Sequence, residues 1–268
     1  MEKKGDWVIP LRTLRFLCAL CGEICYFCSK IFLGESPALF WEKSCIFVQN
    51  INTFNLIMEF NIKQLHYDID QVLEHFGLTA NTECPLIDDW LSLEIPREFV
   101  LPDFLEKQRK RLVKEGAVWN EEELKMHFLS FVLTFAEMEV PNKIKLFYER
   151  QMTETVQGTP LNVICDAVLA TPLGINTPKS PYFFLQEFKK RKKTNDDPEG
   201  QMLVAMLIAQ EKNKDGKPIY GCWVQGKDWT FTTLHEKNYC FSKTLDAAEI
   251  DELQKIIFAL RKLKDLVL

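Results

Sequence analysis

The sequence carries no excess of positive charge. Its 268 residues include 33 Lys and Arg against 38 Asp and Glu, which gives a formal net charge of -5. The chain as a whole therefore lacks the strongly basic balance that favours non-specific binding to nucleic acid, and any site for a polyanion must be local.

Histidine is scarce too. None of the four histidines has the spacing of a metal-ligand set or a catalytic triad: His66, His75, His127 and His235.

Several common site motifs and long apolar runs are also missing. The chain has no P-loop, no dinucleotide-binding glycine fingerprint, no zinc-protease motif and no nucleophile elbow. Residues 14–33 are apolar on average, but Arg15, Glu23 and Lys30 interrupt them before the ~20 residues that a membrane-spanning helix requires. Hydrophobic residues make up 47% of the chain, enough to bury one substantial core. We expect a cytoplasmic globular protein that does not associate with membranes.

The nine cysteines are an odd number and do not suggest a complete disulfide framework. Four of them have two, three and two residues between them: Cys18, Cys21, Cys25 and Cys28. Thiolates at this density can hold zinc or an iron–sulfur cluster, but the same spacing also places them on one stripe of a helix. Four later cysteines stand alone among apolar neighbours, where reduced core thiols are expected: Cys84, Cys165, Cys222 and Cys240.

Regular amphipathic patterning begins close to Met58. We interpret residues 1–57 as an extension of doubtful origin that precedes a true start at Met58. Residues 58–118 are predicted to form a helical arm, with one helix over 59–77 and a basic helix over 105–115. The basic helix is suited either to a solvated surface or to contact with nucleic acid.

Residues 119–268 are predicted to form an α/β (α+β) domain, a mixed β-sheet flanked by helices. A helix capped by Asn120 opens it, and an apolar helix after Asp197-Pro198 divides two groups of three strands. The last helix is predicted to begin at Ala247 with Asp246 as its cap. The six strands are expected over 145–157, 161–171, 182–190, 219–225, 228–236 and 238–244.

Candidate chemistry lies on two of these strands. Asp166 interrupts the apolar strand VICDAVLA, and a carboxylate there must be hydrogen-bonded, paired or bound to a metal. The strand YFFLQEFKK is apolar on both faces, as in the middle of a covered sheet, and places Glu187 and Lys189 on one face at its end. Two carboxylates from adjacent strands form a hard oxygen site for Mg²⁺ (or Mn²⁺) with an ammonium beside it. Phosphodiester hydrolysis needs such a site.

The order of these residues resembles the PD-(D/E)XK nuclease superfamily, which has the restriction-endonuclease-like fold. The matching residues are Asp166, the Glu187-Phe188-Lys189 triplet and Gln201, and the resemblance covers residues 119–268. A more specific similarity is to an uncharacterised bacterial group of that superfamily, with DP-x-GQ after the E-x-K strand. Later residues share that pattern: Ile219, Tyr220, Gly221, Gly226, Trp229 and Phe231. No proline precedes Asp166, although many members have one.

The resemblance implies a metal-dependent nuclease, with DNA as the expected polymer. Asp166 and Glu187, with the backbone carbonyl of Phe188, would hold the metal. Lys189 would activate the attacking water, and Gln201 would orient Lys189 or a phosphate. The superfamily often adds a glutamate from the preceding helix; Glu122 and Glu123 both fit, and we assign Glu123. A basic run would contact the nucleic-acid backbone: Lys190, Arg191, Lys192 and Lys193.

Each assignment has a structural alternative. Asp166 and Lys189 can form a buried ion pair, Glu123 can close a capping box with Asn120, and Gln201 can cap a helix or bridge strands. The basic run can be a solvated loop. The alternative function is a catalytically silent module that binds nucleic acid or a protein on the same fold, and a third is a purely structural domain.

Overall fold

The computed structural model describes residues 68–189 and 197–268, which belong to one compact unit. The extension over 1–57, the expected start at Met58, the cysteine array and the basic run Lys190 to Lys193 all lie outside these residues. No helix in the described part of the chain is both long and apolar enough to cross a membrane.

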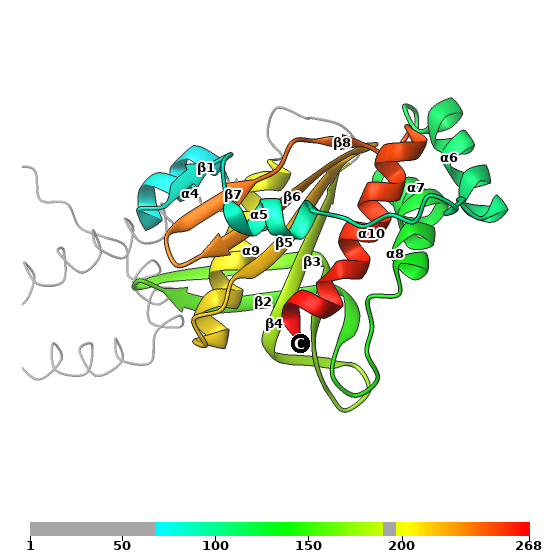
Figure 1. Ribbon diagram of the computed structural model, residues 1–268. Coiled ribbons are helices and arrows are strands. Elements are labelled where there is room, and N and C mark those ends of the chain that lie inside the picture. The colour runs from blue at the N-terminus through cyan, green and yellow to red at the C-terminus, as the bar shows by residue number, and fades with distance from the viewer. Residues whose placement is uncertain (1–67, 190–196) are drawn as a thin grey trace, which may run out of the picture. The chain divides into compact units, whose positions relative to one another are not determined.

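In the described part of the chain, one mixed sheet of eight strands lies between the helices. Figure 1 shows its arrangement. Its main path has the order β1-β7-β6-β5-β4-β3-β2, and β8 pairs with β6. The β1–β7 and β4–β5 pairs are parallel and the others are antiparallel, which confirms the predicted mixed sheet. The strands are β1 (Thr79–Asn81), β2 (Lys145–Val156), β3 (Thr159–Leu173), β4 (Thr177–Lys189), β5 (Ile219–Gln225), β6 (Asp228–His235), β7 (Asn238–Phe241) and β8 (Leu245–Asp246).

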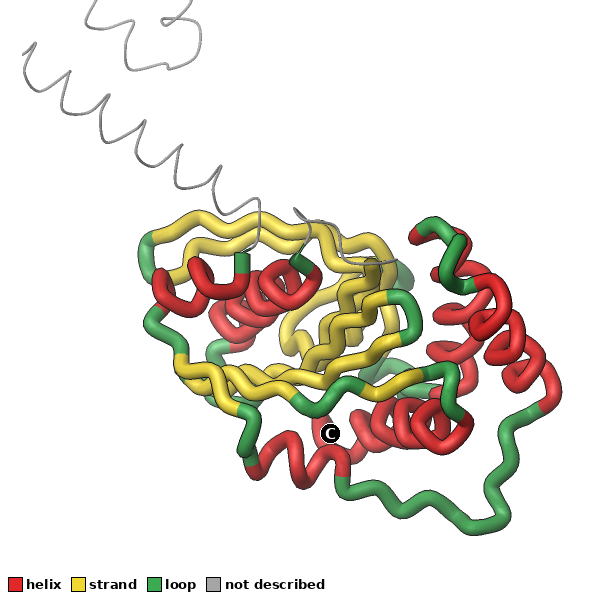
Figure 2. Tube along the Cα trace, turned by 90° about the horizontal axis from the view of Figure 1, so that it is seen from above, coloured by secondary structure: helices red, strands yellow, loops and turns green. Residues whose placement is uncertain are grey.

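Helices cover both faces of the sheet (Figure 2). One apolar core joins the sheet to α5, α6, α7, η1, α8 and α10, and a second core joins it to α4 and α9. The π-helical turn η1 stands between α7 and α8, where the sequence predicts one uninterrupted helix. The helices are α4 (Ile69–Phe76), α5 (Pro85–Leu91), α6 (Asp103–Glu115), α7 (Glu121–Leu124), η1 (Lys125–Leu129), α8 (Ser130–Ala136), α9 (Pro198–Asn213) and α10 (Ile250–Val267).

Helix α9 connects the parallel strands β4 and β5, a connection that parallel pairing requires. It begins as predicted: the Asp197 side chain accepts hydrogen bonds from the backbone N–H groups of Glu199 and Gly200, and Pro198 occupies the first turn. Every residue from Met202 to Ala209 is buried, which agrees with its apolar sequence. The covered strand β4 therefore lies in the middle of the sheet.

Within the segment before residue 119, β1 and α5 pack onto the sheet, whereas α6 packs against η1 and α8. Strand β1, which the sequence analysis did not predict, belongs to this segment and pairs with β7. Trp90 of α5 is fully buried, and its indole N–H donates to the carbonyl of Ala259 on α10 at 2.8 Å. These contacts place α5 and β1 in the same fold as the predicted domain.

Two corrections concern the edges of the sheet. Cys84 and Cys240 form a disulfide, with Cα atoms 6.2 Å apart, so the prediction that both are reduced was wrong. The pairing of β1 with β7 brings them together, whereas Cys165 and Cys222 are free and buried as expected. Asp246 belongs to β8 and does not cap α10, whose cap is Glu249.

Candidate active site

The structure brings Asp166 and the Glu187-Phe188-Lys189 triplet together at the pairing of β3 with β4. Ala167 lies opposite Gln186 in the antiparallel register, so Asp166 is next to the residues that follow Gln186. The backbone N–H of Phe188 donates to Asp166 Oδ2 at 2.7 Å. The Phe188 side chain packs into the apolar core that also includes α7 and η1, as its apolar character predicts. Two segments 22 residues apart are thereby fixed to each other.

Lys189 lies between two carboxylates. Its Nζ is 2.8 Å from Glu187 Oε1 and 3.7 Å from Glu121 Oε2. The sequence spacing predicted the pair with Glu187, because residues two apart in a strand share a face. The other carboxylate, that of Glu121, comes from helix α7. The E-x-K motif is thus joined to the helix that precedes the first long strand.

Lys125, at the start of η1, lies at the centre of this site, although the sequence analysis did not identify it. Its Nζ is 2.6 Å from Asp166 Oδ1, 3.0 Å from Glu149 Oε1 and 3.1 Å from Glu121 Oε1. The term carboxylate–lysine cluster is used below for six residues: Glu121, Lys125, Glu149, Asp166, Glu187 and Lys189. Four carboxylates share two ammonium groups in it, so the fully ionised cluster has two excess negative charges.

The helix glutamate in the cluster is Glu121, whereas the sequence analysis assigned Glu123. Glu122, which also fitted the pattern, is largely exposed and lies at the rim of the cluster, with Oε1 3.7 Å from Lys125 Nζ. The Glu123 carboxylate accepts from the backbone N–H of Asn120 at 2.7 Å, and Asn120 Oδ1 accepts from the Glu123 N–H at 2.8 Å. This capping box is the structural alternative raised above, and it occupies the Glu123 side chain. The four-residue spacing of Glu121 and Lys125 was the available signal, since such residues are neighbours on one helical face.

Glu149 reaches the cluster from an unusual backbone conformation. It lies within β2 but has a φ of 50°, a region that residues other than glycine rarely adopt. Its neighbours Tyr148 and Arg150 pair with Ala167 and Cys165, so Glu149 is level with Asp166 on the adjacent strand. No sequence pattern predicts this conformation.

Gln201 is placed beside β3 rather than on Lys189. Its side-chain Nε2 donates to the backbone carbonyl of Ile164 at 3.1 Å, two residues before Asp166. This bond joins the first turn of α9 to the strand that carries Asp166. Gln201 therefore bridges elements of the fold, and its contribution to the cluster is to support β3.

Burial gives the cluster its electrostatic character. Glu187 is 2% exposed and Asp166 is 7% exposed. Burial raises the pKa of Asp166, while Lys125 and the Phe188 N–H act in the opposite direction. Burial, together with the negative charge of Asp166, raises the pKa of Glu187 to about 9. Burial alone would lower the pKa of Lys125 and Lys189, but their carboxylate partners raise both above the usual lysine value.

The raised pKa of Glu187 predicts a pH dependence of stability in metal-free buffer. Between pH 4.5 and about 9, unfolded chains lose this proton while folded chains retain it. The folded state then binds more protons, so the free energy of unfolding is expected to fall as pH rises through this window. Urea unfolding with EDTA across this range should show a shallower decline in Glu187→Gln, whose amide cannot ionise. Parallel pH profiles in the two proteins would contradict the prediction.

Asp166 and Glu187 carry the type of oxygen ligand that Mg²⁺ and Mn²⁺ prefer. No group of three or more His, Cys, Asp and Glu side chains arranged to hold a metal is found among residues 68–189 and 197–268. The buried carboxylates of Asp166 and Glu187 are nevertheless close enough for the charge of Asp166 to raise the pKa of Glu187. Mg²⁺ is usually held by one or two carboxylates, with waters and substrate phosphates completing its octahedron.

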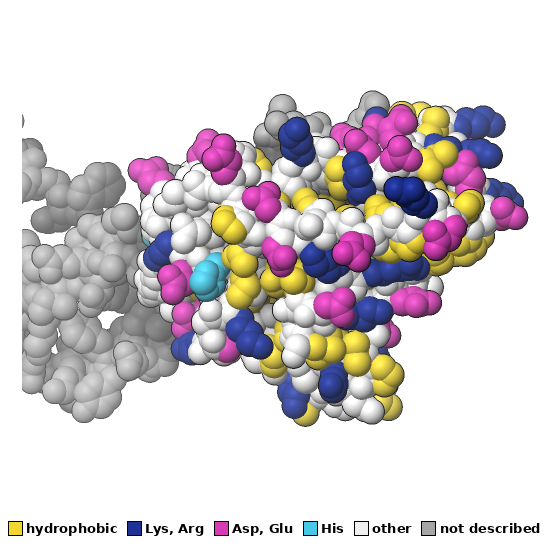
Figure 3. Space-filling model, viewed as in Figure 1, with side chains coloured by type: hydrophobic (Ala, Val, Ile, Leu, Met, Phe, Trp, Pro, Cys, Tyr) yellow, Lys and Arg dark blue, Asp and Glu magenta, His cyan; other side chains and the backbone are white. Residues whose placement is uncertain are grey.

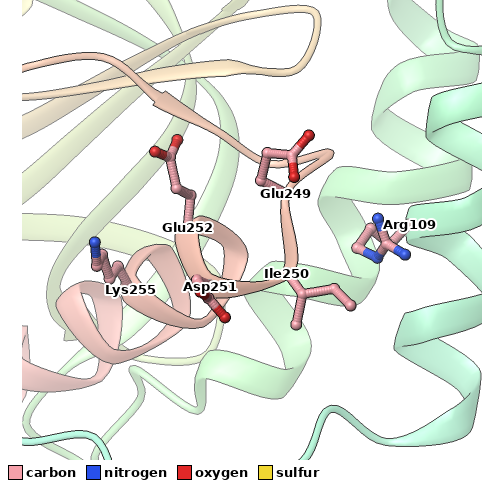
Figure 4. A pocket seen from close by; sticks show the side chains of 6 residues that line it. All are labelled: Arg109, Glu249, Ile250, Asp251, Glu252 and Lys255. Atoms are coloured by element: carbon pink, nitrogen blue, oxygen red, sulfur yellow. The ribbon is translucent and has the colours of Figure 1, made fainter.

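A separate pocket of about 570 Å³ lies at the start of α10. Arg109 reaches it from α6, and the other lining residues belong to α10 or its cap (Figure 4). The Arg109 guanidinium is already bonded to Glu106 and to the carbonyl of Ala248. No residue of the carboxylate–lysine cluster lines this pocket, so its volume gives no information on the chemistry of the cluster.

Comparison with known proteins adds nothing to the resemblance noted in the sequence. No protein-family model matches the chain, and no curated protein has significant sequence similarity to it.

Proposed function

We propose that this protein is a metal-dependent nuclease that hydrolyses phosphodiester bonds of nucleic acid, with DNA as the expected polymer. The observation that carries the proposal is the hydrogen bond from the Phe188 N–H to Asp166 Oδ2. It joins the strand aspartate to the Glu-x-Lys triplet, and Lys189 Nζ is 2.8 Å from Glu187 Oε1 beside it. Two buried carboxylates and an ammonium group are therefore assembled from three consecutive residues and one neighbour on the next strand.

In this proposal Asp166 and Glu187, with the backbone carbonyl of Phe188, hold Mg²⁺ or Mn²⁺. A metal held there would polarise the phosphoryl oxygen and lower the pKa of a bound water. Lys189 remains an ammonium because its carboxylate neighbours raise its pKa. Its role is thus to donate a hydrogen bond that orients the water and to offset the negative charge of the transition state, not to remove a proton. Gln201 supports Asp166 through β3.

Contacts to the phosphate backbone are expected to be local. Acidic and basic side chains of the described residues are interspersed on the face shown in Figure 3, in keeping with the net charge of -5. One exposed stripe of α6 carries three lysines: Lys107, Lys110 and Lys114. Helix α6 packs against η1, the turn that carries Lys125, so this stripe belongs to the same end of the fold as the cluster. It supports binding of a polyanion beside the cluster.

A second candidate function is the catalytically silent binding module. The contact of Lys125 with Asp166 favours it, because both oxygens of this carboxylate already have partners within the protein. Buried ion pairs of this kind also occur without any catalytic role.

Cleavage assays separate the two functions. The protein is incubated with single- and double-stranded DNA and RNA in Mg²⁺, Mn²⁺ or EDTA. A nuclease is expected to cut at least one polymer with metal and none in EDTA. Asp166→Asn should abolish cutting, since its amide oxygen can still accept from Phe188 but its negative charge is gone. A folded wild-type protein that cuts nothing but retains a polymer at low salt would support the silent module. Equal cutting by Asp166→Asn would exclude the proposed site.

A further inference from the structure

Lys125 holds the position that a metal ion would need. Its Nζ lies 2.6 Å from Asp166 Oδ1, the shortest of its contacts, and its side chain is only 17% exposed. Asp166 Oδ2 is taken by the Phe188 N–H, so Oδ1 is the oxygen left for a cation. A divalent cation on Oδ1 would stand beside the ammonium, and two positive charges this close in a buried site repel each other strongly. Both cannot bind Asp166 fully at once.

The cluster provides another place for the ammonium group. Glu149 Oε1 and Glu121 Oε1 lie 3.0 and 3.1 Å from Lys125 Nζ, and both belong to carboxylates more exposed than Asp166. If Asp166 is taken by a metal, Lys125 can keep these two partners with a small change of side-chain rotamer. Its backbone lies in the π-helical turn η1, a feature that is frequent at functional sites. The charge of Lys125 thus stays compensated in both arrangements.

We propose that Lys125 is an internal counter-ion that competes with the divalent cation for Asp166 and thereby sets the metal affinity of the site. The inference rests on the proposed metal site and adds a residue that controls its occupancy. Without metal, Lys125 neutralises Asp166 and stabilises the fold. When the metal binds, Lys125 gives up Asp166 and keeps its contacts with Glu121 and Glu149. Lys125 acts through Asp166 and is a positioning residue.

Metal titration tests this exchange directly. Mn²⁺ binding to the full chain is measured by isothermal titration calorimetry in wild type, Lys125→Met and Lys212→Met. Lys125→Met removes the competing charge, and we expect Mn²⁺ to bind it roughly 10-fold more tightly, in line with the loss of one charged hydrogen bond. Lys212, whose Nζ lies 3.3 Å from Glu154 on another part of the sheet, is the matched control and should leave binding unchanged. Equal or weaker binding by a folded Lys125→Met would overturn the proposal.

Two further measurements do not depend on that variant alone. Glu149→Gln removes a carboxylate that receives the displaced ammonium, so it should weaken Mn²⁺ binding in wild type but have no effect in the Lys125→Met background. An equal loss in both backgrounds would mean that Glu149 acts without Lys125. Should Lys125→Met fail to fold, Lys125→Gln keeps a neutral hydrogen bond to Asp166 and is expected to show the same tightening.

Lysine acylation followed by mass spectrometry reports on the wild-type protein. Lys125 should react slowly without metal and faster with Mg²⁺, because the ammonium loses its closest partner; an unchanged rate would contradict the exchange.

The outcomes of these experiments also distinguish the proposed metal site from the proposed role of Lys125. If wild type and every variant fail to bind Mn²⁺, the metal site itself is absent. If wild type binds Mn²⁺ and Asp166→Asn does not, while Lys125→Met equals wild type, only the role of Lys125 fails.

Discussion

Replacing Lys189 by alanine is expected to lower the rate constant of metal-dependent cleavage by about 10²–10³-fold, the range found when a positioned charge-stabilising donor is removed. The variant should remain folded near neutral pH. The pKa of Glu187 is about 9 even with Lys189 beside it, and loss of this partner raises it further, so Glu187 can keep its proton. Single-turnover cleavage with enzyme in excess measures the chemical step separately from product release.

Lys212→Ala is the matched control for Lys189→Ala. It also removes a lysine that pairs with a glutamate on the sheet, but it lies outside the cluster and should cleave at the wild-type rate. The assignment of the Glu-x-Lys triplet would have to be abandoned if Lys189→Ala, folded and binding Mn²⁺ normally, cleaved as fast as wild type.

Replacing Trp90 by alanine is expected to lower the free energy of unfolding by about 3–5 kcal/mol, the usual cost of removing a fully buried aromatic side chain. The indole of Trp90 is 0% exposed and contacts the rings of Phe184, Tyr220 and Phe231 edge-on. Its hydrogen bond to Ala259 would also be lost. Urea unfolding at constant pH measures the change.

Phe104→Ala serves as the comparison for Trp90→Ala. Phe104 belongs to the same predicted arm but is 46% exposed, so its loss should cost well under about 2 kcal/mol. Similar, small losses in both variants would show that α5 does not contribute to the core of the sheet, contrary to the structure.

The sequence predicts the central strands well because their composition leaves few alternatives. The strand around Asp166 and the strand that ends in Glu187 and Lys189 are rich in β-branched and aromatic residues, which favours strands over buried helices. Proline and glycine mark their ends. The Asp197-Pro198 signal likewise located the start of α9. The core of the candidate site, Asp166 with the Glu-x-Lys triplet, could therefore be identified from the sequence alone.

The remaining half of the cluster depends on tertiary contacts that no local pattern contains. Glu121 and Lys125 sit at ordinary helical spacing among several charged neighbours, and only the packing of α7 and η1 against β3 distinguishes them. Glu123 carried the stronger local signal, a capping box, and that signal describes its actual role. The pairing of β1 with β7, and with it the disulfide between Cys84 and Cys240, joins segments from opposite ends of the described chain.

That pairing of β1 with β7 also bears on the order in which the protein folds. Strands β2, β3 and β4, and likewise β5, β6 and β7, pair with their neighbours in the chain, so each group can form from a short segment. Strand β1 must wait for β7, and closing so long a loop costs entropy before any contact offsets it. With only three residue pairs, β1 should also be the first strand to detach in native-state fluctuations. The cross-link between Cys84 and Cys240, which are 156 residues apart, keeps a detached β1 close to its place, so that its return is a local search.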